Sequence, residues 1–218
     1  MPSIQKNQRT LILTLIPLII AAMIMTPRLI SAQFGMFDDG AILLTVENIL
    51  QGDLRMSNDL QAGRFRPFYW AYYTLIFSLV GMTPFWFYIG HLILLLILIT
   101  QIRLLMKNMG ATPLQSLIAS LVFLFSMPII ENFYTLSKGE PLQLIFLLAA
   151  IINFQKLNPK KAVWRAFLIS LCLLSAILVK ETAITMIPLA LFWLIYLFIW
   201  RKPIQKIEKQ KAAILLLS

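Results

Sequence analysis

The chain has 218 residues, of which 60% are hydrophobic and only 13% are charged, and its mean hydropathy is +0.82. A soluble domain of this length needs more polar residues to cover its surface, so the composition excludes an ordinary soluble globular protein. The net charge of +10 does not indicate a nucleic-acid-binding protein, because the cytoplasmic loops of membrane proteins are rich in Lys and Arg. Cys172 is the single cysteine, which excludes a disulfide within the chain.

Uncharged apolar runs recur along the sequence, and about 20 such residues in a helix match the hydrocarbon core of a bilayer. The first run is Leu11–Ile30, which follows Lys6 and Arg9 and which we interpret as an uncleaved signal anchor. A polar stretch, residues 31–66, separates it from a short aromatic segment, Pro67–Met82. The later runs are Phe85–Met106, Pro113–Ile130, Pro141–Phe154, Val163–Val179 and Ala183–Trp200, followed by a run from Ala212 to the end at Ser218.

These runs predict an all-α polytopic membrane protein with about six complete transmembrane helices and a truncated seventh. Residues 1–218 would form a single transmembrane module, in which residues 31–84 are an outer loop with amphipathic juxtamembrane helices. The last run is too short to cross a bilayer, so we expect the chain to be the N-terminal part of a longer protein.

The distribution of Lys and Arg predicts the orientation of this module, since these residues collect on the cytoplasmic side. If Pro67–Met82 lies in the interface, 13 of the 19 Lys and Arg residues share the cytoplasmic side with the N-terminus. If the segment spanned the membrane, most of them would lie outside. We therefore expect a multi-pass protein of the plasma (inner) membrane, with a cytoplasmic N-terminus and Pro67–Met82 at headgroup depth, which its Tyr and Trp residues also favour.

The same topology places eight of the nine acidic residues outside and only Glu208 inside. Acidic residues contribute little to membrane orientation, so this separation needs another cause. The tendency of loops to carry charge does not explain why the cytoplasmic loops lack acids. We interpret the pattern as a polar site on the outer face, where several helix ends converge.

The first candidates for this site lie in the long outer loop. Asp38 and Asp39 follow the first run, and a carboxylate at the membrane surface suits a general base. Asp39 could instead cap the amphipathic segment Ala41–Gln51. Arg64 and Arg66 precede the aromatic segment and could bind a lipid-linked phosphate bidentately, or simply reach toward headgroups.

The remaining candidates follow later runs. Lys138 and Glu140 lie in one outer loop, although Glu140 also suits the start of a helix because an acid there complements the helix dipole. Lys180 and Glu181 stand between two apolar runs with almost no loop, where charges are costly unless they have partners. His91 lies inside a run, where a lone His is more often a hydrogen-bonded core residue than a ligand.

These motifs occur in a characteristic order along the chain. Asp-Asp-Gly stands at the head of the outer loop, and Arg-Pro opens the aromatic segment. Gly-Met-Thr-Pro precedes the run that contains the His, and Lys-Gly-Glu-Pro and Val-Lys-Glu-Thr-Ala follow. This order resembles the N-terminal module of the GT-C membrane glycosyltransferases, in particular the protein O-mannosyltransferase-like and aminoarabinose-transferase-like enzymes, over nearly the whole chain.

The resemblance implies an inverting glycosyltransferase that moves a sugar from a polyprenyl-phosphate donor to an acceptor glycan, lipid or protein on the periplasmic or extracellular face. It implies that Asp38 is the catalytic base. The residues expected to bind substrate are Asp39, Arg64, Arg66, Lys138, Glu140, Lys180, Glu181 and His91. No cofactor is certain; a divalent metal, if one binds, would be held by Asp39 and Glu140. Membrane lipids are further partners, and no nucleic acid is expected.

Two other functions stay open at this point. One is a transporter or flippase of lipid-linked glycans, which would need polar groups along a path at mid-membrane. The other is a non-catalytic membrane scaffold related to such enzymes.

Overall fold

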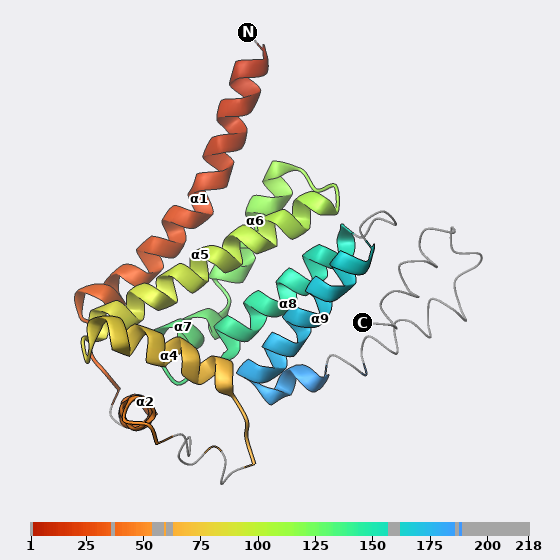
Figure 1. The fold of residues 1–218 in the computed structure, drawn as a ribbon. Coiled ribbons are helices and arrows are strands. Elements are labelled where there is room, and N and C mark those ends of the chain that lie inside the picture. Colours follow the sequence, from red (N-terminus) through yellow and green to blue (C-terminus); the bar gives the residue numbers. More distant parts are fainter. Residues whose placement is uncertain are drawn as a thin grey trace.

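The computed structural model describes residues 2–35, 38–53, 59, 63–156, 162–185 and 188. Within these residues the chain forms eight α-helices and a short 3-10 helix (Figure 1). The helices are α1 (Pro2–Ile30), α2 (Asp38–Leu50), α4 (Pro67–Val80), α5 (Pro84–Asn108), α6 (Pro113–Leu124), α7 (Met127–Tyr134), α8 (Glu140–Gln155) and α9 (Ala162–Val179), and the 3-10 helix is η2 (Glu181–Thr185).

Proline determines where many of these helices begin. A Pro occupies the first or second position of α4, α5, α6, α7 and α8. Its missing N–H costs nothing there, because the first amides of a helix have no partner within the helix. Gly81, with a φ of 62° that favours glycine, ends α4 and lets the chain turn into α5.

Two of the described helices are long and apolar enough to cross a membrane, namely the part of α1 from Thr10 to Ile30 and the whole of α5. A third span exists only if α6 and α7 count as one, and these two helices are bent by 61° at the break between them. The protein is therefore compatible with membrane association through two or three helices. The helix α4 is not among the candidate spans.

The predicted count of about six complete spans and a truncated seventh is therefore wrong. The apolar run Pro113–Ile130 is broken where Ser126 becomes the N-cap of α7 and Pro128 occupies its first turn. The 16 residues of α8 give a length of about 24 Å at ~1.5 Å per residue, below the roughly 30 Å of the hydrocarbon core. The run Ala183–Trp200 begins within η2 and otherwise falls almost entirely outside the described residues, as does the run from Ala212.

The centre of the molecule is α5. It packs against α1, α6 and α8, and α8 in turn pairs with α9 (Figure 1). Leu95, Leu98 and Ile99 of α5 are fully buried in one cluster with Met25 of α1 and Phe133 of α7. Because the apolar side chains of α5 face helices on several sides, its polar residues need partners on those helices.

One such residue is Arg103, whose partners lie on α1. Pro17 has no N–H, so the carbonyl oxygen of Leu13, four residues earlier, lacks its usual helical hydrogen bond. Arg103 supplies the missing donor, since its Nη1 donates to that oxygen at 2.6 Å and its Nη2 donates to the hydroxyl of Thr14 at 2.7 Å. The proline and the arginine together set how α1 sits along α5.

This arrangement predicts an energetic coupling between Arg103 and Pro17. Arg103→Met should destabilise the protein, because it leaves the Leu13 carbonyl without a donor. The loss should be smaller by about 1 kcal/mol in a Pro17→Ala background, where the restored backbone N–H occupies that carbonyl. Thermal unfolding of the four proteins in one detergent measures the coupling, and strictly additive effects would contradict it.

The helix α4 lies across the end of the bundle where α5 and α8 begin (Figure 1). Its Tyr73 is buried and donates a hydrogen bond to the carbonyl of Leu136, in the loop before α8. Gly90 of α5 allows the close approach, because a Cβ atom there would lie 2.7 Å from the hydroxyl oxygen of Tyr72. These contacts pack α4 against α5 and against the loop before α8 at this end of the molecule.

Candidate functional site

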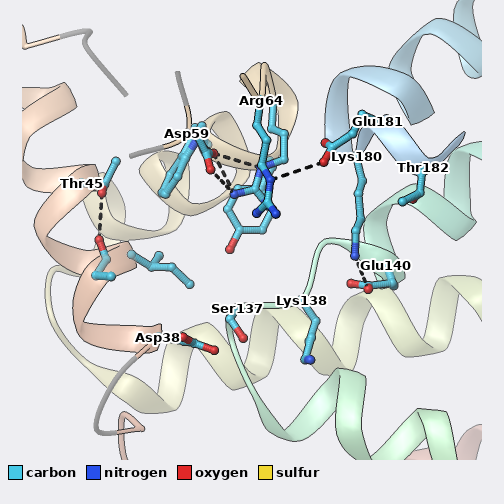
Figure 2. Close-up of a pocket in the computed structure, with 15 residues that line it drawn as sticks. Asp38, Thr45, Asp59, Arg64, Ser137, Lys138, Glu140, Lys180, Glu181 and Thr182 are labelled. Atoms are coloured by element: carbon cyan, nitrogen blue, oxygen red, sulfur yellow. Dashed lines mark hydrogen bonds and ion pairs between the residues drawn. The ribbon is translucent and has the colours of Figure 1, made fainter. Parts of the chain in front are cut away.

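A cavity of about 450 Å³ lies at this end of the bundle (Figure 2). Its walls come from α2, the segment before α4, the first turn of α4, the loop before α8, the start of α8 and η2. Eight charged side chains line it, four acidic and four basic, and their formal charges cancel: Asp38, Asp59, Arg64, Arg66, Lys138, Glu140, Lys180 and Glu181.

The structure brings seven of the nine residues predicted for the site into this one cavity, from positions scattered along the chain. They are Asp38, Arg64, Arg66, Lys138, Glu140, Lys180 and Glu181. The two that do not line it are Asp39 and His91. Asp59, Thr45, Ser137 and Thr182 contribute further polar groups that were not predicted from the sequence.

Asp39 does not line the cavity and is 3% exposed. Its carboxylate accepts hydrogen bonds from the backbone N–H of Gly35, at 2.6 Å, and of Leu136, at 3.3 Å. It therefore ties the first turn of α2 to the segment after α1 and to the loop before α8. In this way Asp39 positions the wall that carries its neighbour Asp38.

His91 lies in the protein interior and is 1% exposed. Its Nε2 is 3.3 Å from the hydroxyl of Tyr73, and its Nδ1 is 3.2 Å from the carbonyl oxygen of Phe133. These contacts join α4, α5 and α7. His91 is thus a hydrogen-bonded core residue. Its partner Tyr73 also donates to the loop before α8, which forms part of the cavity wall.

Arg66 is held firmly by Asp59. The carboxylate of Asp59 accepts from Nε of Arg66 at 2.9 Å, from Nη2 at 2.7 Å, and from the indole N–H of Trp70 at 2.8 Å. Burial alone would lower the pKa of Arg66, but the hydrogen bond and the charge of Asp59 outweigh it and raise the pKa. Because Asp59 takes the Nε and Nη2 of the guanidinium, Arg66 cannot offer that side to a ligand. No sequence motif marks Asp59, which is seven positions before its partner.

Lys180 and Glu140 form the second ion pair of the cavity, through a hydrogen bond between their charged groups. Burial would raise the pKa of Glu140, but the hydrogen bond from Lys180 and the backbone N–H of Glu140 itself lower it below the ordinary value, which favours the ionised carboxylate. Gln143 donates to the carbonyl of Lys180 at 2.8 Å and contacts the hydroxyl of Thr182 at 3.2 Å, which fixes the end of α9 beside α8. The charge of Lys180, at the junction of α9 and η2, is therefore partnered.

The other two cations have weaker or outer partners. Nε of Arg64 lies 3.6 Å from Glu181, and both side chains are about half exposed. Lys138 pairs with Glu131 at 2.9 Å, and this hydrogen bond raises the pKa of Lys138. Glu131 does not line the cavity, so Lys138 brings a positive charge into the cavity while its partner stays outside.

Asp38 differs from the other acidic residues of the cavity. It is exposed and makes no hydrogen bond or ion pair with any described residue. Figure 2 shows Asp38 and Ser137 on the side of the cavity opposite Arg64. Asp38 is thus a carboxylate free to accept a proton or a hydrogen bond from a molecule in the cavity.

The two residues named as metal ligands do not share a site, because Glu140 lines the cavity and Asp39 does not. Among the described residues there is no group of three or more His, Cys, Asp or Glu side chains that could hold a metal ion.

Comparisons of the chain with protein-family models, with curated proteins and with solved structures found no significant match.

Proposed function

We propose that this protein is a membrane glycosyltransferase that moves a sugar from a polyprenyl-phosphate donor to an acceptor, with Asp38 as the general base. The observation that carries the proposal is the state of Asp38. Among the acidic residues that line the cavity, it is the one without a hydrogen bond or ion pair to a described residue, although its charge acts at longer range on Lys138. A general base must be free to take a proton from its substrate, and a carboxylate already bound to a cation is a poorer base.

The basic residues of the cavity suit the phosphate of the donor. Arg64 and Lys138 each carry a positive charge that a described cavity acid does not hold tightly. A phosphate that leaves as charge develops on it needs cations more than it needs an acid catalyst. The distance across the cavity from Arg64 to Asp38 then separates the leaving group from the base (Figure 2).

The reaction follows from this division of roles. Asp38 accepts the proton of the acceptor hydroxyl or amine, whose oxygen or nitrogen forms a bond to the anomeric carbon of the sugar. The bond from that carbon to the phosphate oxygen breaks, and the polyprenyl phosphate keeps the electron pair. A single displacement of this kind inverts the configuration of the sugar.

The place of the cavity in the fold suits a lipid-linked donor. α1 and α5 are antiparallel, since Arg28 near the end of α1 contacts Tyr88 near the start of α5. Three residues of the cavity wall, Ile42, Tyr69 and Trp70, share a buried cluster with Phe87 and Tyr88 near the start of α5. The cavity therefore lies at the end of the molecule from which α1 and α5 both lead away. A polyprenyl tail lying in the bilayer could therefore present its phosphate to the cavity without leaving the membrane.

The experiment that tests this function supplies membranes containing the protein with a panel of polyprenyl-phosphate hexoses and pentoses. Mass spectrometry follows the release of polyprenyl phosphate and the mass gain of membrane glycans, lipids and proteins. We expect one donor to be consumed with an inverted product. Consumption of no donor, or transport of intact donor between leaflets, would contradict the proposal.

We also propose that the cavity lies on the non-cytoplasmic side of the plasma membrane and the N-terminus on the cytoplasmic side. Lys107, in the last turn of α5, and Lys6 and Arg9, in the first turns of α1, belong to the opposite end of the two spans. They support this orientation, because Lys and Arg collect on the cytoplasmic side of membrane proteins. In a Cys172→Ala background, Gln51→Cys should react with an impermeant thiol reagent added to intact cells, and Met109→Cys should react only after lysis. The reverse pattern would invert the orientation, and equal labelling would show that α5 does not cross.

A further inference from the structure

The three ion pairs that line the cavity differ in strength. The pair between Arg66 and Asp59 is bidentate, and the side chains are only 14% and 9% exposed. The pair between Lys180 and Glu140 has a direct hydrogen bond. In contrast, Arg64 and Glu181 meet at a single distance of 3.6 Å, which is too long for a hydrogen bond, and their side chains are 54% and 44% exposed.

An exposed pair of this kind contributes little free energy, because water and salt screen it. The terminal nitrogens of Arg64 have no described partner, and its Nε has only the long contact with Glu181. The bidentate side formed by Nε and a terminal nitrogen is therefore the one for which another anion competes with Glu181. Arg66 cannot do the same, since Asp59 holds its Nε and Nη2. Arg64 is therefore the arginine of the cavity that a phosphate can engage through two nitrogens.

Glu181 is placed as a competitor for Arg64. It starts η2, and its Oε1 faces Nε of Arg64. Its second oxygen, Oε2, is shielded from solvent and has no hydrogen-bond partner, so the present position leaves this carboxylate incompletely satisfied. A carboxylate that is half exposed and only partly satisfied can rotate toward water at small cost.

We propose that Glu181 is an internal competitor and not a ligand of the donor: it occupies Arg64 in the empty cavity and is displaced when a phosphate monoester or diester binds there. The phosphate replaces a long, monodentate contact with a bidentate one, and Glu181 moves to solvent. This exchange keeps the charge of the cavity balanced when it is empty and sets the affinity for the phosphate of donor and product. The proposal deepens the proposed function, on which it rests for the identity of the anion.

The test measures binding of farnesyl phosphate, inorganic phosphate and farnesol to the purified full chain in detergent, at constant ionic strength. Glu181→Gln should tighten binding of both phosphates by about two- to fivefold, the equivalent of an exposed ion pair. Arg64→Gln should weaken both by roughly tenfold or more. Equal behaviour of the two phosphates would identify the anion alone as the ligand, whereas binding of farnesyl phosphate only would assign the site to a lipid-linked phosphate.

Glu47→Gln is the matched control, because it removes one negative charge from α2 without changing a cavity residue. If it tightens binding as much as Glu181→Gln, the effect is a general electrostatic one and the proposal is overturned. Weaker binding by Glu181→Gln would make Glu181 a ligand and would overturn the proposal while the transfer function stands. If neither the parent protein nor any variant binds either phosphate, the proposal is also overturned.

The two proposals can fail separately. If phosphate binding follows the expected order but no polyprenyl-phosphate sugar is consumed, the competition at Arg64 stands and the transferase function fails. If a donor is consumed but Glu181→Gln leaves both phosphate affinity and the Michaelis constant for donor unchanged, the function stands and the competition fails.

Discussion

Asp38→Asn is expected to lower the rate of sugar transfer by about 10²- to 10⁴-fold, the usual contribution of a general base. The amide keeps the size of the side chain but cannot accept the proton of the acceptor. The rate of polyprenyl-phosphate release from the donor, measured at saturating donor, gives the size of the loss. Binding of donor should change little, because Asp38 lies across the cavity from Arg64 (Figure 2).

The neighbouring Asp39→Asn variant is the matched control for this result. Asp38 has no described partner, so its replacement should leave the unfolding temperature unchanged. Asp39 accepts two backbone N–H groups in the interior, and the loss of its charge should destabilise the protein by about 1–3 kcal/mol. Full activity of Asp38→Asn, or equal loss of activity and stability in both variants, would remove Asp38 from the catalytic role.

The pair Asp38 and Asp39 also shows how far the sequence predicts a site. The sequence predicts a general base at Asp38 and allows a capping role for Asp39. Which of the two faces the cavity depends on Gly35 and on Leu136, whose amides bind Asp39. Leu136 is 97 positions away, so no local pattern could predict this contact.

Asp59 was not predicted for a related reason. It stands in the polar outer loop among other charges, and nothing in its immediate sequence distinguishes it. Its role appears only when the chain folds so that Arg66, the N-cap residue of α4, and Trp70, in the first turn of α4, meet the same carboxylate. Charge and hydropathy predict that such residues gather at one end of the molecule, but not which of them form pairs.

The number of spans was predicted wrongly because hydropathy measures composition and not continuity. Apolar runs of suitable length contain caps and prolines that interrupt the helix, as Ser126 and Pro128 do between α6 and α7. Long-range contacts then allow shorter apolar helices to pack against their neighbours, as α8 does against α5 and α9. The apolar runs predict most of the helices, such as α5, α8 and α9, but not how many helices are long and apolar enough to cross a membrane.

Asp59→Leu is expected to destabilise the protein by about 3–5 kcal/mol, the cost of leaving a largely buried guanidinium without its partner. The side chain of Arg66 is 14% exposed, and its carboxylate partner also accepts from Trp70, so both donors would lose their acceptor. Thermal unfolding of the purified chain in detergent measures the loss.

The paired substitution separates this cost from a simple packing defect. Asp59→Leu combined with Arg66→Met removes both charges and should recover most of the stability, because two apolar side chains can fill the same volume. The pair between Lys138 and Glu131 is more exposed and provides the comparison for a weak ion pair. Glu131→Gln should lower the free energy of unfolding by less than about 1 kcal/mol. If the double variant is no more stable than Asp59→Leu alone, the charge of Arg66 is not what Asp59 compensates. Recovery of stability without recovery of donor binding would instead place Arg66 among the groups that the cavity needs in a fixed orientation.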